Sequence, residues 1–113
     1  MHEMSLCEGV MQVIESQAAI DNYQQVNAVW LEIGLLSGVE IESLKFCFDV
    51  VCRNSIAENA TLEIVELPGQ AWCMQCANNL TVTSRHSACP DCGSYQLQVT
   101  GGDEMRIKEL EVV

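Results

Sequence analysis

Four cysteines in two closely spaced pairs constrain this chain more than any other feature of its sequence. Twelve residues separate the pairs in a C-x2-C-x12-C-x2-C pattern that consists of Cys73, Cys76, Cys89 and Cys92. Two residues between thiolates allow a tight turn to direct both sulfurs at one ion, and two such turns complete the tetrahedron that Zn²⁺ accepts. The pattern predicts a closed, structural zinc site, because four thiolates leave no position for water or substrate.

Other interpretations of this cluster stay open at the level of sequence. Without a metal, four thiols in a polar loop would be exposed to oxidation. A redox dithiol usually begins a helix after a strand, whereas this chain shows two facing pairs. Iron is the main alternative to zinc, because a site of four sulfur ligands suits both metals. His86 is a further candidate ligand, although a solvated loop histidine is the ordinary interpretation of that residue.

Composition restricts the partners and the compartment of the chain. Its 113 residues allow one domain with a small appendage. Sixteen Asp and Glu against five Lys and Arg give a formal net charge of −11, which disfavours binding to nucleic-acid phosphates. The apolar runs are too short to cross a bilayer, and no secretory signal is visible. The seven cysteines then favour a reducing compartment, and we expect a cytoplasmic protein with neither nucleic-acid nor membrane partners.

Hydrophobic periodicity predicts a mixture of helices and strands. Apolar residues at helical spacing predict amphipathic helices at residues 6–20 and 40–53, with Ser5 and Glu8 as a capping box for the first helix. Alternating apolar residues predict four strands, at residues 26–33, 61–67, 95–99 and 105–112. Residues 70–94 contain too few large apolar side chains for a core of their own. Three further cysteines lie on the helices and are expected to be small buried side chains: Cys7, Cys47 and Cys52.

The first three residues form a second candidate metal site. Met1, His2 and Glu3 run almost directly into the first predicted helix, so an α-amine, an imidazole and a carboxylate are tethered close together. We expect Met1 to be retained, because methionine removal generally requires a small second residue. An amine, backbone amide nitrogens and an imidazole make a chelate that favours square-planar Ni²⁺ or Cu²⁺. Because the metal must displace amide protons, binding is reversible and weak at low pH, which suits delivery better than storage.

Four stretches of the sequence carry a family resemblance: MHEMSLCEGVMQVIE, VWLEIGLLSGVE, CFDVVC, and AWCMQC with the later CPDCG. In order and separation they resemble the HypA/HybF family of hydrogenase-maturation nickel metallochaperones, over essentially the whole chain. The resemblance implies an α+β fold with two helices on a small three-stranded sheet and an inserted four-cysteine zinc-ribbon-like domain. The nickel-binding domain would comprise residues 1–69 plus 100–113, and the zinc-binding domain residues 70–99.

The same resemblance implies a function and the roles of individual residues. His2 would be the essential nickel ligand, assisted by the Met1 amine and by Glu3, while the four paired cysteines would hold zinc. The chain would receive Ni(II) as cargo and insert it, with a nickel-handling GTPase, into the large subunit of a [NiFe]-hydrogenase. It would catalyse no reaction, and the sequence contains no G-x-x-x-x-G-K-[ST] loop, so GTP hydrolysis would belong to the partner. Both a monomer and a homodimer remain open.

Two other classes of function remain open from the residues alone. With iron in the four-cysteine cage, the protein would be an electron carrier, and elemental analysis distinguishes that case. With zinc there and no nickel at the N-terminus, it would be an interaction module without a role in metal transfer. Nickel titration of a native N-terminus distinguishes the latter.

Overall fold

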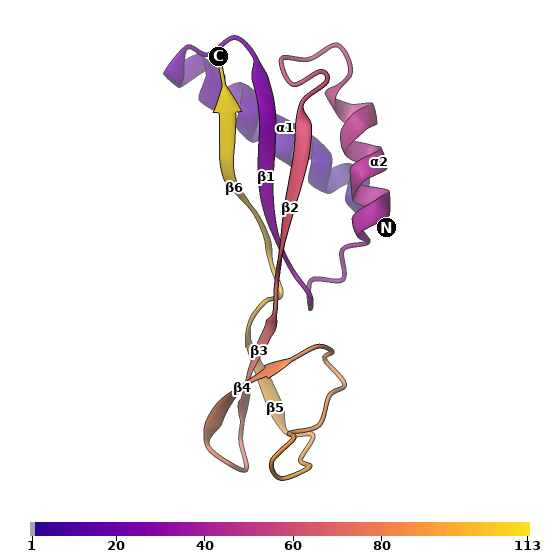
Figure 1. Ribbon diagram of the computed structural model, residues 1–113, viewed down its shortest axis with the longest axis vertical. Coiled ribbons are helices and arrows are strands. Elements are labelled where there is room, and N and C mark those ends of the chain that lie inside the picture. Colours follow the sequence, from indigo (N-terminus) through magenta and orange to yellow (C-terminus); the bar gives the residue numbers. More distant parts are fainter. Residues whose placement is uncertain (1) are drawn as a thin grey trace. The chain divides into compact units, whose positions relative to one another are not determined.

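Residues 2–113 form two helices and six strands in this computed structural model, and these are the residues that the structure describes (Figure 1). In chain order the elements are α1 (Glu3–Asp21), β1 (Val26–Gly34), α2 (Ile41–Cys52), β2 (Thr61–Leu67), β3 (Gly69–Cys73), β4 (Asn78–Val82), β5 (Leu97–Gly101) and β6 (Met105–Val112). The strands pair into two three-stranded sheets, in the orders β2-β1-β6 and β4-β3-β5. Two helices, small sheets and a four-cysteine cluster confirm the α+β fold class.

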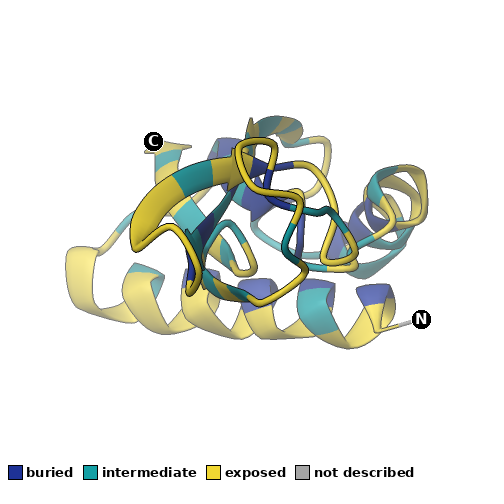
Figure 2. Cartoon of the chain, turned by 90° about the horizontal axis from the view of Figure 1, so that it is seen from below, coloured by how far each residue is buried: buried dark blue, intermediate teal, exposed yellow. Residues whose placement is uncertain are grey.

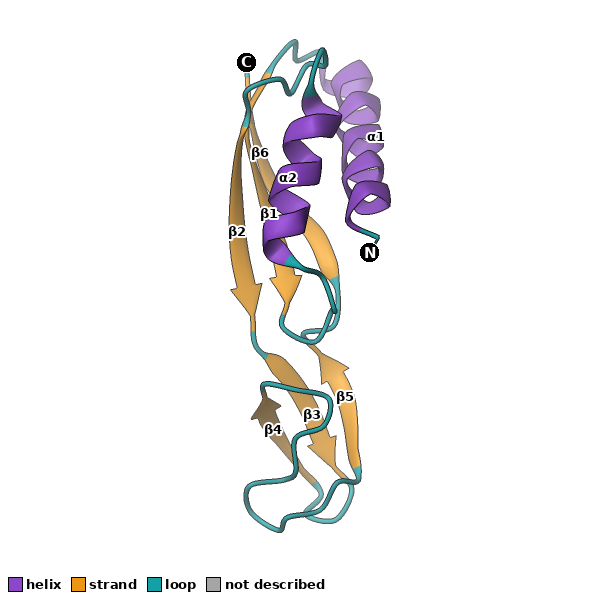
Figure 3. Cartoon of the chain, turned by 90° about the vertical axis from the view of Figure 1, so that its right-hand side faces the viewer, coloured by secondary structure: helices purple, strands orange, loops and turns teal. Residues whose placement is uncertain are grey.

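The chain divides into two compact units. The first contains both helices and the adjoining parts of β1, β2 and β6, and it runs up to Leu31 and over Val39–Ile64 and Ile107–Val113. The second consists of Glu32–Gly38 and Val65–Arg106 and includes β3, β4 and β5. Figure 3 shows the long loop that connects β4 to β5. Within residues 2–113, neither helix combines the length and the apolar character that crossing a membrane requires.

The core of the first unit combines the apolar faces of α1 and α2 with buried side chains of β1, among them Val26, Val29 and Leu31. Both helices bury side chains at spacings of three and four residues, as their amphipathic patterns predict: Cys7, Val10, Met11 and Ile14 from α1, and Leu44, Phe48 and Cys52 from α2. The Cys7 thiol donates to the Leu44 carbonyl oxygen at 3.5 Å. Figure 2 shows that α1 is buried along one side and exposed along the other.

The N-terminus of α1 differs from its prediction. The helix begins at Glu3, three residues before the predicted start, and His2 is its N-cap. The capping box predicted at Ser5 and Glu8 is therefore wrong, because Ser5 already lies inside the helix. The physical reason lies in Glu3, whose negative charge interacts favourably with the helix N-terminus. The Glu3 side chain also accepts a hydrogen bond from Glu40, which ties the first turn to the start of α2.

The second unit is built around β3, which pairs antiparallel with both β4 and β5. The sequence does not predict β3 and β4, because β3 buries only Gly69, Ala71 and Cys73 and the exposed positions of β4 are polar. The small core contains Leu36, Ala71 and Val82, with Leu80, Leu97 and Val99 packed against them. Leu36, Leu97 and Val99 lie outside residues 70–94. Neighbouring segments therefore complete a core that this stretch cannot form alone.

Glycines allow the close backbone approach that brings Leu36 into this core. The Leu36 N–H donates to the Gly102 carbonyl oxygen at 2.8 Å. Gly102 has a φ of +76°, and a Cβ there would lie 2.2 Å from the Pro68 carbonyl oxygen. A Cβ on Gly34 would lie 2.0 Å from the Gly102 oxygen. Larger residues at these two positions would push the backbones apart, so glycine is required at both.

Candidate metal centres

The first cysteine pair lies in the tight turn between β3 and β4. Cys73 is the last residue of β3 and faces Asn78 of β4 across the pair of strands. Ala77 closes the turn with a φ of 53°, and its N–H donates to the Cys73 carbonyl oxygen at 2.9 Å. The backbone N–H of Cys76 points back to the Cys73 sulfur at 3.4 Å. The antiparallel pairing thus holds both sulfurs of this pair on one side of the turn.

The second cysteine pair lies in a loop that folds back on itself. The Gly93 N–H donates to the Cys89 carbonyl oxygen at 2.8 Å, and Gly93 has a φ of +76°, a conformation that glycine adopts without strain. The Cys89 N–H donates to the Ser94 carbonyl oxygen, also at 2.8 Å. These hydrogen bonds form a compact turn around Cys92.

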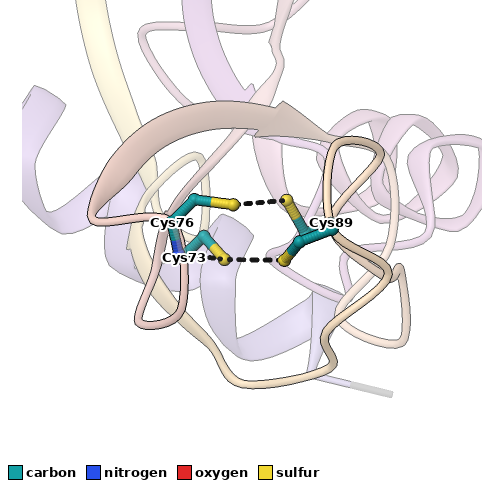
Figure 4. Close-up of side chains that lie close together, drawn as sticks. Cys73, Cys76 and Cys89 are labelled. Carbon is teal, nitrogen blue, oxygen red and sulfur yellow. Dashed lines mark hydrogen bonds between the residues drawn. The ribbon is translucent and has the colours of Figure 1, made fainter.

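The four sulfurs converge, and two of the distances between them match the edge of a tetrahedral metal site. The Cys73 and Cys92 sulfurs are 3.7 Å apart, the Cys76 and Cys89 sulfurs are 3.8 Å apart, and all four lie within 4.8 Å of one another (Figure 4). A tetrahedron with Zn–S bonds of about 2.3 Å has edges of about 3.8 Å. Cys73 and Cys89 are buried, whereas Cys76 and Cys92 are exposed. His86 is exposed and does not belong to the cluster.

The thiols of this cluster influence one another's ionisation. The hydrogen bond from the Cys76 N–H lowers the pKa of the Cys73 thiol to about 7. The pKa of the Cys76 thiol is raised, because it shares its proton with the Cys92 sulfur and is partly desolvated. A divalent metal bound between these sulfurs favours their thiolate forms, and its binding releases protons.

The predicted nickel ligands lie at the start of α1. Met1 lies outside the described residues. His2 is exposed, and its carbonyl oxygen accepts the first helical hydrogen bond, from the Leu6 N–H at 2.9 Å. Glu3 is only 4% exposed, and its Oε2 accepts a hydrogen bond from the Glu40 N–H at 3.2 Å. An exposed histidine is thus followed in the chain by a carboxylate that the fold holds in place.

The structure adds Glu40 to the surroundings of this site. Glu40 is the N-cap of α2, and its own carboxylate accepts a hydrogen bond from the Glu42 N–H at 3.1 Å. Sequence periodicity cannot reveal its contact with Glu3, because the two residues are 37 positions apart. The one available signal was an acidic residue directly before the apolar pattern of the second helix, where N-cap residues are found.

The remaining cysteines lie on the helices, as predicted. Burial raises the pKa of the Cys7 thiol to about 12 and that of the Cys52 thiol to about 11, so both stay protonated near neutral pH. Cys47 is half-buried. The expectation of small buried side chains is thus met fully by Cys7 and Cys52 and in part by Cys47.

Comparison with known proteins places these features in one family. A family model described as the hydrogenase/urease nickel incorporation metallochaperone HypA matches residues 1–112. The hydrogenase maturation factors HypA of Azotobacter chroococcum and Albidiferax ferrireducens are each 61% identical to this chain over 112 residues, covering 99% of both chains. The HypA of Azotobacter vinelandii is 57% identical over the same length.

A solved structure shares the fold. The solution structure of the nickel metallochaperone HypA from Helicobacter pylori superposes with a TM-score of 0.73 at 24% sequence identity. The match covers 100% of this chain and 98% of the other. At this identity the likeness concerns the fold alone.

Proposed function

Because the chain belongs to the HypA family of nickel-incorporation metallochaperones for hydrogenase maturation, we propose that it binds Ni(II) at its N-terminus and delivers it to the large subunit of a [NiFe]-hydrogenase. The observation that carries the proposal is an exposed His2, directly followed in the chain by a Glu3 carboxylate that the Glu40 N–H holds in place. Imidazole and carboxylate bind first-row divalent metals, and an exposed site allows the metal to be passed on.

In this proposal His2 is the essential nickel ligand, and the Met1 amine and the Glu3 carboxylate assist it. The backbone amide nitrogens of the first residues complete a nitrogen-rich donor set when they are deprotonated. Support comes from the short connection between these residues and α1, which keeps the donors together. Because protons compete for the amine and the imidazole, nickel is released as the pH falls.

The proposal assigns zinc to Cys73, Cys76, Cys89 and Cys92, as a structural ion in a domain of residues 70–99. The distances between their sulfurs support a four-sulfur metal site that zinc fits, and the small core of the surrounding unit supports a structural role. The nickel-binding domain then comprises residues 1–69 and 100–113. A site closed by four thiolates has no open position, so cargo transfer belongs to the N-terminal site.

The partners in this proposal are a nickel-handling GTPase and the hydrogenase large subunit, and the chain works in the cytoplasm. It serves as a carrier and not as an enzyme, in keeping with a family described as metallochaperones. Neither nucleic acid nor membrane takes part, and the net charge of −11 supports the exclusion of nucleic acid.

Metal analysis and nickel titration of tag-free protein test the proposal. We expect one zinc per chain in the purified protein and one further nickel on titration. His2→Ala should abolish nickel binding while zinc content and circular dichroism stay unchanged, and His86→Ala serves as the matched control that leaves both metals in place. Iron in place of zinc would contradict the structural zinc site. Wild-type nickel affinity in His2→Ala would contradict the N-terminal site.

A further inference from the structure

A shallow hollow lies between the first turn of α1 and one face of α2. Its volume is about 500 Å³, and its lining consists of Glu3, Met4, Glu42, Ser43, Phe46 and Cys47. The four α2 residues follow one another at spacings that place them on one helical face. The buried residues Leu44, Phe48 and Cys52 form a different face, so the hollow does not belong to the core.

Two large apolar side chains line this hollow and are exposed to water. Met4 is 40% exposed and Phe46 is 68% exposed. Single exposed apolar residues are common on protein surfaces, and Val13 of α1, at 51%, is an example outside the hollow. Met4 and Phe46 differ from it because they line the same concave surface. An apolar side chain inserted there would lose water on both sides, as do the central anchors of protein interfaces.

The surroundings of the hollow are acidic. Glu42 lies on its lining with a side chain that is 80% exposed, and it pairs with Lys45 at 3.4 Å. The whole first unit has eleven Asp and Glu against three Lys and Arg, which gives −8 of the total net charge of −11. A partner surface that approaches this hollow is attracted if it carries Lys and Arg and is repelled if it is acidic.

We propose that the hollow is the docking site for a basic segment of the protein that exchanges nickel with this chain. One apolar side chain of that segment inserts between Met4 and Phe46, and a neighbouring Lys or Arg pairs with Glu42. The proposal rests on the proposed function and specifies the chemistry of the partner. Glu3 connects the docking site with the nickel site, because it lines the hollow and is also a proposed nickel ligand. A segment docked there lies directly beside the cargo.

Binding measurements with two purified probes test this docking site. The probes are the nickel-handling GTPase and the hydrogenase large subunit of the same organism, each titrated against the full chain at low and high salt. Phe46→Ala should weaken the binding of at least one probe about tenfold or more, whereas Val13→Ala, which removes a similarly exposed side chain outside the hollow, should not. Phe46→Leu should restore most of the affinity, because it keeps an apolar side chain.

A charge reversal tests the acidic part of the site. Glu42→Lys should weaken the binding of the same probe about tenfold at low salt, and this loss of affinity should be smaller at high salt. Glu63→Lys makes the same charge change on β2 of the same unit and should have a much smaller effect. Equal losses for Glu42→Lys and Glu63→Lys would reveal general charge attraction and would overturn a specific docking site.

Nickel titration of the variants separates this proposal from the proposed function. Phe46→Ala should bind nickel with wild-type affinity, because Phe46 is not a proposed ligand. If wild-type protein bound no nickel but its probe binding still depended on Phe46, the proposed function would fail and the docking site would stand. If neither probe bound the wild type, or if Phe46→Ala bound both as tightly as Val13→Ala does, the docking site would be wrong.

Discussion

The Glu3 carboxylate is held in position by the backbone of another helix. The Glu40 N–H supplies the hydrogen bond, and the side chain of Glu3 is almost fully buried. In Glu3→Gln the amide oxygen can still accept this hydrogen bond, but the negative charge is gone. We therefore expect circular dichroism to stay unchanged and nickel affinity to fall about tenfold in calorimetry, which corresponds to about 1.4 kcal/mol.

Glu8→Gln is the control for that experiment, because it removes the same charge from an exposed position of α1. Its nickel affinity should equal that of the wild type. If Glu3→Gln and Glu8→Gln behaved alike, Glu3 would have no role as a ligand.

The buried thiols of Cys7 and Cys52 make the protein sensitive to high pH. Their pKa values rise from 9.0 to about 12 and about 11, so the unfolded chain loses these protons at lower pH than the folded chain does. Stability from this source is complete below about pH 9 and is lost as the pH rises further. Urea unfolding measures the free energy of unfolding at pH 8 and at pH 10.5. The decrease between these two pH values should be smaller for Cys7→Ala than for the wild type. Equal losses would contradict these pKa values.

Among the elements, β3 and β4 depend most directly on the cysteine cluster. Cys76→Ala removes one of the four converging sulfurs, and we expect the zinc content of the purified protein to fall sharply. Hydrogen exchange should then accelerate across residues 70–94, whereas α1 and α2 keep their protection, because their own apolar faces stabilise them. Cys47→Ala is the matched control and should retain zinc. Unchanged exchange in residues 70–94 would mean that the metal does not stabilise this segment.

The connections around Gly102 should tolerate no larger residue. Gly102→Ala places a Cβ at a φ of +76° and against the Pro68 carbonyl oxygen, so we expect a loss of about 1–3 kcal/mol or more in urea unfolding. Gly9→Ala in α1 is the opposite control, because a Cβ there meets nothing within 4 Å. It should stabilise the protein by about 0.5–1 kcal/mol. A neutral Gly102→Ala would show that the backbone can move apart at little cost.

The elements differ in how far their sequence predicts them. The amphipathic faces of α1 and α2 and the alternation in β1 and β2 are local patterns, so periodicity located them to within a few residues. β3 and β4 are short and bury few large side chains, and they exist because β3 pairs on both sides. Pairing of this kind depends on distant segments, which a local pattern does not contain.

The same distinction applies to the metal centres. The spacing of the four cysteines predicted their convergence, because two tight turns need only local geometry. The contact between Glu3 and Glu40 links the starts of two helices and could not be predicted from either segment alone. The hollow beside it likewise requires both helices to be in place.

At the scale of the whole molecule, the two ends of the chain should respond differently to added residues. An extension before Met1 converts the proposed amine ligand into an amide, so nickel affinity should fall at least tenfold while His2 and Glu3 stay chemically intact. An extension after Val113 should leave nickel affinity unchanged, because it alters none of the proposed ligands Met1, His2 and Glu3. Calorimetry on matched N-tagged, C-tagged and untagged protein measures the difference. Equal affinities for all three would remove Met1 from the site.

The strand orders have a consequence for how this protein folds during its synthesis on the ribosome. β1 is the central strand of its sheet and precedes every other strand in the chain, yet its neighbour β6 follows all the other strands. β3 can likewise pair with β4 as soon as β4 has been made, but its pairing with β5 requires a later segment of the chain. Leu36 is synthesised long before Leu97 and Val99, which pack in the same small core. Neither sheet can close until its last strand, β6 or β5, has left the ribosome, so the nascent chain exposes one unpaired edge of β1 and one of β3 until then.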